Sequence, residues 1–158
     1  MIIISDASPI NYLVLIGHID VLPVLFGRVI IPPTVLTELQ SPGASAAVQV
    51  WAASPPQWLE IQAPAKIDTT LRLGAGEREA IGLAQELGAD QLLIDDLAGR
   101  RAAVSRGLIV AGTAAVIVAS AKRGLLNLTS AVSALRQTNF RAGPTIWQWL
   151  SSQQIPPP

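Results

Sequence analysis

Short runs of aliphatic residues, several of them β-branched, recur along the chain and are separated by longer segments with helical patterns. They are Ile2–Ile4, Val29–Ile31, Leu92–Ile94 and Leu108–Val110. Apolar runs without alternation are typical of strands that are buried on both faces, as in the centre of a parallel sheet. A further segment, Trp58–Ile61, alternates apolar and polar residues and predicts a short edge strand.

Helical patterns fill the segments between these strands. We expect helices over residues 9–16, 19–26, 35–40, 44–53, 77–87, 97–106, 113–123, 130–137 and 144–153. Glycine follows several of them, as Gly88 does, and is a common helix stop. Strands that alternate with helices predict a single α/β domain with a central parallel sheet flanked by helices. We place this domain at residues 1–153 and expect residues 154–158, which end in three prolines, to be a frayed tail.

Acidic residues follow two of the predicted core strands at the point where each strand ends. Asp6 follows the first, and the pair Asp95 and Asp96 follows the third. The carboxyl ends of parallel strands meet at one edge of a sheet, which is where open α/β sheets bind their ligands. We predict that Ser8 caps the next helix, with Pro9 at its first position, which leaves Asp6 free for another role.

Two glutamates can reach the same edge of the sheet. Glu38 lies in the helix after the second strand, and Glu77 lies at the start of the helix before the third. Carboxylates gathered into one metal-sized cluster repel each other unless a cation lies between them. Oxygen ligands without histidine or cysteine favour Mg²⁺ or Mn²⁺, and such ions promote phosphodiester hydrolysis. Taken singly, Glu77 also fits a helix-dipole role and Glu38 a solvated surface.

Composition narrows the possible classes of protein. The chain has 158 residues, of which 50% are hydrophobic and 14% charged, so we expect some apolar surface to face a partner. The absence of cysteine excludes a disulfide framework and a thiolate metal site. The longest apolar stretch, residues 108–121, is interrupted and too short to span a membrane. No signal peptide is visible, so we expect a cytoplasmic protein.

A net charge of zero hides an uneven distribution of charge along the chain. No Asp or Glu follows Asp96, whereas basic residues do: Arg100, Arg101, Arg106, Lys122, Arg123, Arg136 and Arg141. A basic half beside an acidic cluster favours a polyanionic substrate, which one part holds and the other cuts. Charge runs are more often solvated surface, so this asymmetry is weak support when taken alone.

Several stretches, taken together, resemble a PIN domain of the bacterial branch near the VapC-type toxins. They are Ile4–Ile10, Ile31–Leu39, Gly76–Ile81, Leu93–Arg100 and Gly112–Thr113, in an order and spacing that cover residues 2 to about 126. The resemblance implies a three-layer α/β sandwich with a central parallel sheet. It also implies a ribonuclease that depends on Mg²⁺ or Mn²⁺.

The resemblance also assigns roles to individual residues. The catalytic positions match Asp6, Glu38, Glu77 and Asp96. The metal ligands match Asp6, Asp96, Asp95 and Glu77, and we favour Asp96 over Asp95 as the direct ligand. Polar residues beside the site match Ser8, Asn11 and Thr113. From their charge and position, we expect the phosphates of RNA to be held by Arg100, Arg101, Lys122 and Arg123.

We therefore expect a metal-dependent endoribonuclease that is the toxin of a toxin–antitoxin pair. Its expected partners are RNA, a second copy of the chain and a small antitoxin protein. One alternative is a phosphatase like the haloacid dehalogenases, with Asp6 as nucleophile, but these enzymes need a second aspartate where this chain has Ser8. The other is a PIN-fold module that binds RNA without cleaving it, and the complete set of acids argues against it.

Overall fold

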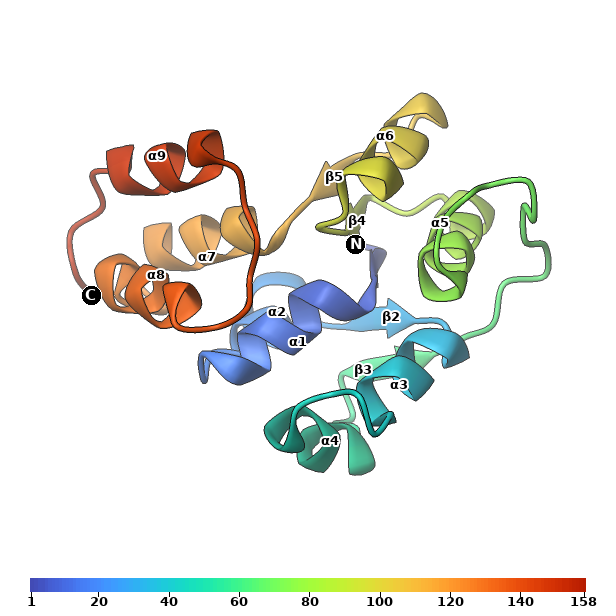
Figure 1. Cartoon of the computed structure of the whole chain (residues 1–158), viewed down its shortest axis with the longest axis horizontal. Helices are drawn as coiled ribbons and strands as arrows, with labels where there is room; N and C mark the ends of the chain where they lie inside the picture. Colours follow the sequence, from blue (N-terminus) through green and yellow to red (C-terminus); the bar gives the residue numbers. More distant parts are fainter.

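The computed structural model describes residues 1–158 and contains a central sheet with helices on both faces (Figure 1). The sheet has five strands in the order β3-β2-β1-β4-β5, and every neighbouring pair is parallel. The strands are β1 Ile3–Ser5, β2 Val29–Ile31, β3 Leu59–Ile61, β4 Gln91–Leu93 and β5 Val110–Ala111. The predicted α/β architecture with a parallel sheet is therefore confirmed, and the alternating segment forms the edge strand β3.

The helices follow the predicted order, with bounds that differ by a few residues. They are α1 Ala7–Leu15, α2 Val21–Phe26, α3 Pro33–Gln40, α4 Ala46–Ala53, α5 Ala75–Leu87, α6 Leu97–Ser105, α7 Thr113–Lys122, α8 Leu128–Arg136 and α9 Pro144–Ser152. None of them combines the length and the apolar character that a membrane crossing requires.

Each face of the sheet has its own hydrophobic core. Ile3 and Leu93 belong to a cluster of 25 buried residues that includes side chains of α1, α3, α4 and α7. Ile4 and Leu92 point the other way, into a cluster of 9 buried residues with side chains of α5 and α6. Because successive strand residues point to opposite faces, and both faces are covered, both positions must be apolar. This explains why the central strands appear in the sequence as unbroken apolar runs.

The first helix begins two residues earlier than the sequence predicted, at Ala7 instead of Pro9. Its N-cap position is Asp6, in an extended conformation with φ −77° and ψ 174°, and α1 starts at Ala7. The backbone N–H of Asp6 still donates to the carbonyl oxygen of Leu93 at 2.9 Å, so the chain leaves the sheet directly at Asp6. The prediction that Ser8 caps this helix is therefore wrong, because Ser8 lies inside the first turn. The Asp6 side chain, although at the cap position, makes no capping hydrogen bond.

The order of the strands places a topological switch point at the carboxyl ends of β1 and β4, and we call this region the crevice. From β1 the chain moves to β2 on one side, and after β3 it returns to β4 on the other side of β1. The connections therefore diverge between β1 and β4, which is the position where open α/β sheets bind ligands. Any residue that follows either strand directly is delivered to this crevice.

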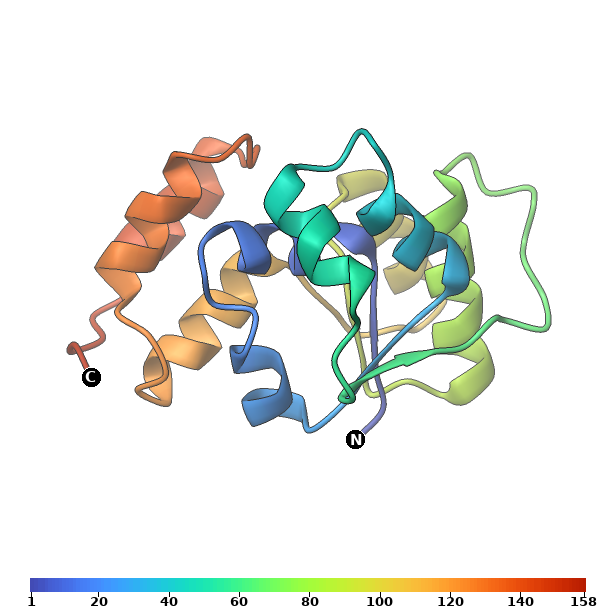
Figure 2. The same cartoon turned by 90° about the horizontal axis from the view of Figure 1, so that it is seen from below.

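The helices α8 and α9 lie at one end of the molecule, and α5 lies at the other (Figures 1 and 2). Aromatic contacts join this C-terminal part to α1. The ring of Phe140 lies edge-on to Tyr12 and to Trp147, with ring centroids 5.0 Å and 5.8 Å apart. The Tyr12 hydroxyl donates to the side-chain oxygen of Asn139 at 3.0 Å. These contacts hold the segment between α8 and α9 against the helix that carries Ser8 and Asn11.

Candidate functional site

Asp6 is a buried carboxylate at the crevice. It is 6% exposed, and its Oδ1 atom is buried without any hydrogen-bond partner. The pKa of Asp6 is raised to about 7, and burial is the largest cause. The Ala7 amide lowers it, and the charges of Glu77, Glu38 and Asp95 each raise it by a smaller amount. A buried oxygen that has no donor needs either a proton or a cation to balance its charge.

Glu38 reaches the crevice from α3 because a glycine of α5 lies opposite to it. A Cβ atom placed on Gly76 would lie 2.6 Å from Oε1 of Glu38, closer than real Cβ contacts occur. The absence of a side chain at Gly76 therefore allows the Glu38 carboxylate to rest against α5. Partial burial raises the pKa of Glu38, and the charge of Glu79 raises it further. The resemblance placed Gly76 beside a catalytic acid, yet its steric role could not be seen in the sequence.

Glu77 lies in the first turn of α5, near enough to Asp96 and Glu38 for their charges to act on it. Burial raises the pKa of Glu77 most, the charge of Asp96 raises it next, and Glu38 adds a smaller contribution. Asp6, Glu38, Glu77, Asp95 and Asp96 are thus close enough to interact electrostatically in pairs. The structure therefore brings acids from four parts of the chain to one region. Asp6 follows β1, Glu38 lies in the helix after β2, Glu77 lies in the helix before β4, and Asp95 and Asp96 follow β4.

The two adjacent aspartates after β4 have different surroundings. Asp95 accepts two hydrogen bonds from Thr113, one from the backbone N–H to Oδ1 at 2.7 Å and one from the hydroxyl to Oδ2 at 2.6 Å. Burial raises the pKa of Asp95, while Thr113 and the charge of Arg100 lower it. Asp96 is exposed, and its Oδ2 accepts from the N–H of Gly99 at 2.8 Å, which caps α6. Asp95 therefore joins β4 to α7, and Asp96 keeps one oxygen without a donor.

Arg100 lies at the border of the crevice, on α6. Its Nη1 donates to the carbonyl oxygen of Ile94 at 3.3 Å. A Cβ atom on Gly112 would lie 2.8 Å from Arg100 Nη1 and also 2.8 Å from Asp95 Oδ1, so glycine is what admits both groups. Arg101 is exposed on the same helix. The two arginines also line an open groove of about 400 Å³ with four other residues: Leu97, Val104, Ser105 and Val110.

Lys122 and Arg123 are not brought to the crevice. They lie at the C-terminal end of α7, whose N-terminal residue is Thr113. At 1.5 Å per residue, that end of the helix is about 14 Å from the crevice. Arg123 instead donates from Nη1 to the carbonyl oxygen of Val24 at 3.1 Å. The sequence analysis grouped four basic residues at one RNA-binding surface. In the fold, Arg100 and Arg101 lie on α6, whereas Lys122 and Arg123 lie apart from them at the end of α7.

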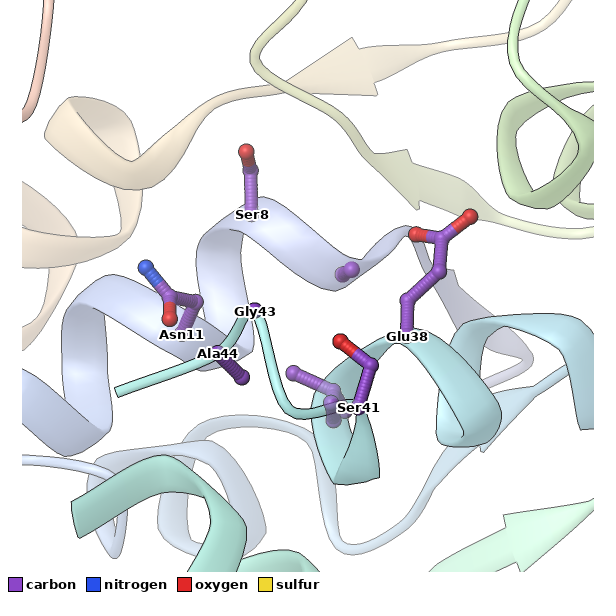
Figure 3. A pocket seen from close by; sticks show the side chains of 8 residues that line it. Ser8, Asn11, Glu38, Ser41, Gly43 and Ala44 are labelled. Atoms are coloured by element: carbon purple, nitrogen blue, oxygen red, sulfur yellow. The ribbon is translucent and has the colours of Figure 1, made fainter. Parts of the chain in front are cut away.

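An open cleft of about 220 Å³ lies between α1 and the segment that follows α3 (Figure 3), and its lining includes Ala7, the residue after Asp6. It is lined by Ala7, Ser8, Asn11, Glu38, Leu39, Ser41, Gly43 and Ala44. Ser8 and Asn11 were expected beside the site, and both border this cleft. Ser41 and Gly43 carried no signal in the sequence, because only the turn between α3 and α4 brings them to face α1.

The chemistry of these groups fits a divalent metal ion, although the side chains do not form a finished ligand set. All candidate donors are carboxylate oxygens, which suit Mg²⁺ and Mn²⁺, and Asp6 Oδ1 is buried without a partner. No three His, Cys, Asp or Glu side chains of the chain stand close enough to hold an ion as they are. The expected metal-sized cluster is therefore not formed. Two features keep the carboxylates apart. Carboxylates without a cation between them repel each other, and those of Asp95 and Asp96 are held by hydrogen bonds that they accept within the protein.

Comparisons with known proteins agree with this architecture. Residues 2–153 match the family DUF3368, described as a PIN domain. The fold is similar to the solved structure of a PilT N-terminus domain protein from the hyperthermophilic archaeon Sulfolobus solfataricus P2. The two share 15% sequence identity with a TM-score of 0.52, over 90% of this chain and 100% of the archaeal chain. No curated protein sequence matches the chain.

Proposed function

Because this chain belongs to the DUF3368 family of PIN domains, a fold generally found in nucleases, we propose that it is a metal-dependent endoribonuclease. Asp6 carries this proposal. It is buried in the crevice between β1 and β4, its Oδ1 atom lacks a partner, and its pKa is raised to about 7. A group in that state is suited to bind a cation, and it costs free energy when no cation is present.

The residues that would hold the metal ion are Asp6, Asp96 and Glu77. Asp6 offers the unpartnered Oδ1, and Asp96 keeps one oxygen beyond its bond to Gly99. Both oxygens of Asp95 already accept from Thr113, which favours a supporting role for Asp95. When bound, Mg²⁺ or Mn²⁺ would lower the pKa of a water molecule and offset negative charge at the phosphate.

The other residues of the crevice would position the RNA. Arg100 is held beside the acids by its bond to the carbonyl oxygen of Ile94, so its guanidinium can contact a phosphate next to the cleaved bond. Arg101, exposed on the same helix, can contact the next phosphate along the strand. Glu38, at the border of the crevice, can accept a proton or a hydrogen bond from water.

The test is an RNA cleavage assay with purified protein in Mg²⁺, in Mn²⁺ and in a chelator. We expect cleavage only with a divalent ion and its loss in Asp6→Asn and Glu77→Gln. The matched control is Asp20→Asn, because Asp20 is exposed and its side chain makes no hydrogen bond at its own helix cap. Cleavage that persists in Asp6→Asn would refute the proposed site.

One observation favours a second candidate, an RNA-binding module without turnover. The carboxylates do not stand in a ready-made ligand set, and a fold that binds RNA through Arg100 and Arg101 needs no metal. This candidate predicts RNA binding that is unchanged by chelator and no cleavage with any divalent ion. The same assay, combined with a binding measurement in chelator, therefore separates the two candidates.

We also propose the biological setting that the sequence predicted, a toxin of the VapC-like branch with an antitoxin and a second copy of the chain as partners. Exposed apolar side chains on α9 support a protein partner, since Ile146 is 38% and Trp149 39% exposed. Sedimentation of the purified chain tests the dimer. A neighbouring gene for a small protein with a DNA-binding part would support the antitoxin.

A further inference from the structure

The cleft between α1 and the segment that follows α3 has a lining that differs from the rest of the site. No basic side chain contributes to it, and its only charged residue is Glu38. The remaining polar groups are neutral: the hydroxyls of Ser8 and Ser41, the amide of Asn11 and the backbone around Gly43. A phosphate in this cleft would meet no positive charge and would lie near the carboxylate of Glu38. The cleft therefore suits a neutral polar ligand.

The polar side chains of this lining are available to such a ligand. Unlike Asp95 or Asp96, the side chains of Ser8, Asn11 and Ser41 take part in none of the hydrogen bonds within the chain. Ser8 and Asn11 rise from α1, and Ser41 comes from the facing segment after α3 (Figure 3). Solvated hydroxyls and amides are common on any surface. These three line one concave surface together with Glu38, whose carboxylate interacts with that of Asp6.

The bare backbone at Gly43 adds room on the same side. A Cβ atom on Gly43 would meet only Ser41 Oγ, at 3.8 Å, and its φ does not require glycine. A flat ligand can therefore approach the backbone closely at this position. A larger side chain could also be introduced there without backbone strain, which makes Gly43 a useful position for blocking the cleft.

We infer that this cleft binds the base and ribose of a nucleotide next to the cleaved phosphate, so that it sets which sequence is cut. The inference rests on the proposed ribonuclease function. The Asn11 amide offers one donor and one acceptor group, which matches the mixed donors and acceptors along the edge of a base. The hydroxyl of Ser41 can donate to or accept from the same base edge. The hydroxyl of Ser8 can contact the ribose, including its 2′-hydroxyl. Because a base must leave its stack to enter, the substrate would be single-stranded RNA or a loop.

A first experiment tests binding without any need for cleavage. The ¹⁵N-labelled chain is titrated in chelator with adenosine, guanosine, cytidine and uridine, and separately with inorganic phosphate. We expect at least one nucleoside to shift the amide signals of Ser41 and Gly43 and the side-chain amide of Asn11, with phosphate leaving them unchanged. Gly43→Leu should abolish these shifts. If no nucleoside moves these signals, or if phosphate alone moves them, the inference is wrong.

A second experiment measures specificity during cleavage. Wild type, Ser41→Ala and Gly43→Leu cut a pool of random single-stranded RNA, and the ends of the products are sequenced. We expect wild type to prefer certain bases beside the cut, Ser41→Ala to lose up to about tenfold of that preference, and Gly43→Leu to lose it or change it. The control is Gln148→Ala, an exposed position on α9.

The outcomes separate this inference from the proposed function. Cleavage without base preference in wild type, or the same preference in all variants, would overturn the inference and leave the ribonuclease intact. No cleavage by wild type, together with nucleoside shifts at Ser41 and Gly43, would refute the ribonuclease and retain a nucleoside-binding cleft. A third outcome is that Ser41→Ala cuts much more slowly than wild type, while its remaining products show the same base preference. That result would assign Ser41 to the reaction and would also overturn the inference.

Discussion

Thr113 donates to both carboxylate oxygens of Asp95, from its backbone N–H at 2.7 Å and from its hydroxyl at 2.6 Å. Thr113 is fully buried, so this pair fastens the start of α7 to the end of β4 in the interior of the protein. The same contact occupies Asp95 and leaves Asp96, its neighbour in the sequence, as the acid with a free oxygen. The different surroundings of Asp95 and Asp96 thus follow from the contact that Thr113 makes with Asp95 alone.

Thr113→Val should destabilise the protein, because it removes the hydroxyl donor and keeps the shape of the side chain. One oxygen of the partly buried Asp95 carboxylate would lose its partner, which costs about 1–3 kcal/mol in the free energy of unfolding. Urea unfolding in chelator measures this change. Thr113→Ser retains the hydroxyl and should lie closer to wild type. Equal stability of all three proteins would mean that the contact contributes nothing.

Gly76→Ala should lower cleavage more than it lowers stability. The new Cβ atom would lie 2.6 Å from Oε1 of Glu38, so the flexible Glu38 side chain must swing away from α5. The matched control is Gly74→Ala, whose Cβ atom would meet Glu77 Oε1 at an ordinary 3.8 Å. We expect a reduced kcat in Gly76→Ala and little change in Gly74→Ala, with melting temperatures measured in parallel. A normal kcat in Gly76→Ala would show that the position of Glu38 is unimportant.

The sequence predicted the sheet and most helices because their signals are local. Apolar triplets mark strands that are buried on both faces, and glycine or proline marks most boundaries. The start of α1 was missed because it depends on the hydrogen bond from Asp6 to Leu93, a contact between strands that no local pattern encodes. The cleft with Ser41, and the close approach of Gly76 to Glu38, likewise depend on how helices pack.

Salt dependence should distinguish the two basic pairs. Arg101→Glu should weaken RNA binding and reduce the slope of log K against log salt by about 0.7 or more, because at least one phosphate contact is lost. Lys122→Glu is the matched control, since Lys122 lies at the far end of α7. We expect its slope to stay close to that of wild type in fluorescence titrations at several salt concentrations. If both variants reduce the slope equally, Lys122 also contacts RNA phosphates, and the RNA-binding surface extends along α7 beyond the crevice.

The stability of the metal-free protein should fall as the pH rises from about 4 to about 7. The pKa of Asp6 is 3.8 in its unperturbed form and about 7 in the fold, so the folded state binds the proton more tightly. Stability linked to this proton is complete below the lower pKa and is lost as the pH passes through the higher one. The difference corresponds to about 4 kcal/mol at most. Urea unfolding in chelator across this range measures it, and a flat profile would contradict the burial of a charged Asp6.

Asp6→Asn separates the metal chemistry from folding. Asparagine keeps the shape of the side chain and removes a charge that burial and the carboxylates of Glu77, Glu38 and Asp95 disfavour. The metal-free variant should therefore be as stable as wild type or more stable at pH 7, and its stability should depend less on pH. It also lacks a proposed metal ligand, so Mg²⁺ should no longer raise its melting temperature by mass action. Cleavage should be lost.

Melting curves of both proteins, with and without Mg²⁺, and one cleavage assay on each decide between the roles of Asp6. If Asp6 served only as the cap of α1, asparagine would replace it with little cost, and activity would survive. That role already fits poorly, because the Asp6 side chain makes no capping hydrogen bond. The Asp20→Asn control should keep both the response to Mg²⁺ and the cleavage. An Asp6→Asn protein that still gains stability from Mg²⁺ but cleaves no RNA would place the metal on other carboxylates and leave Asp6 a role in the reaction alone.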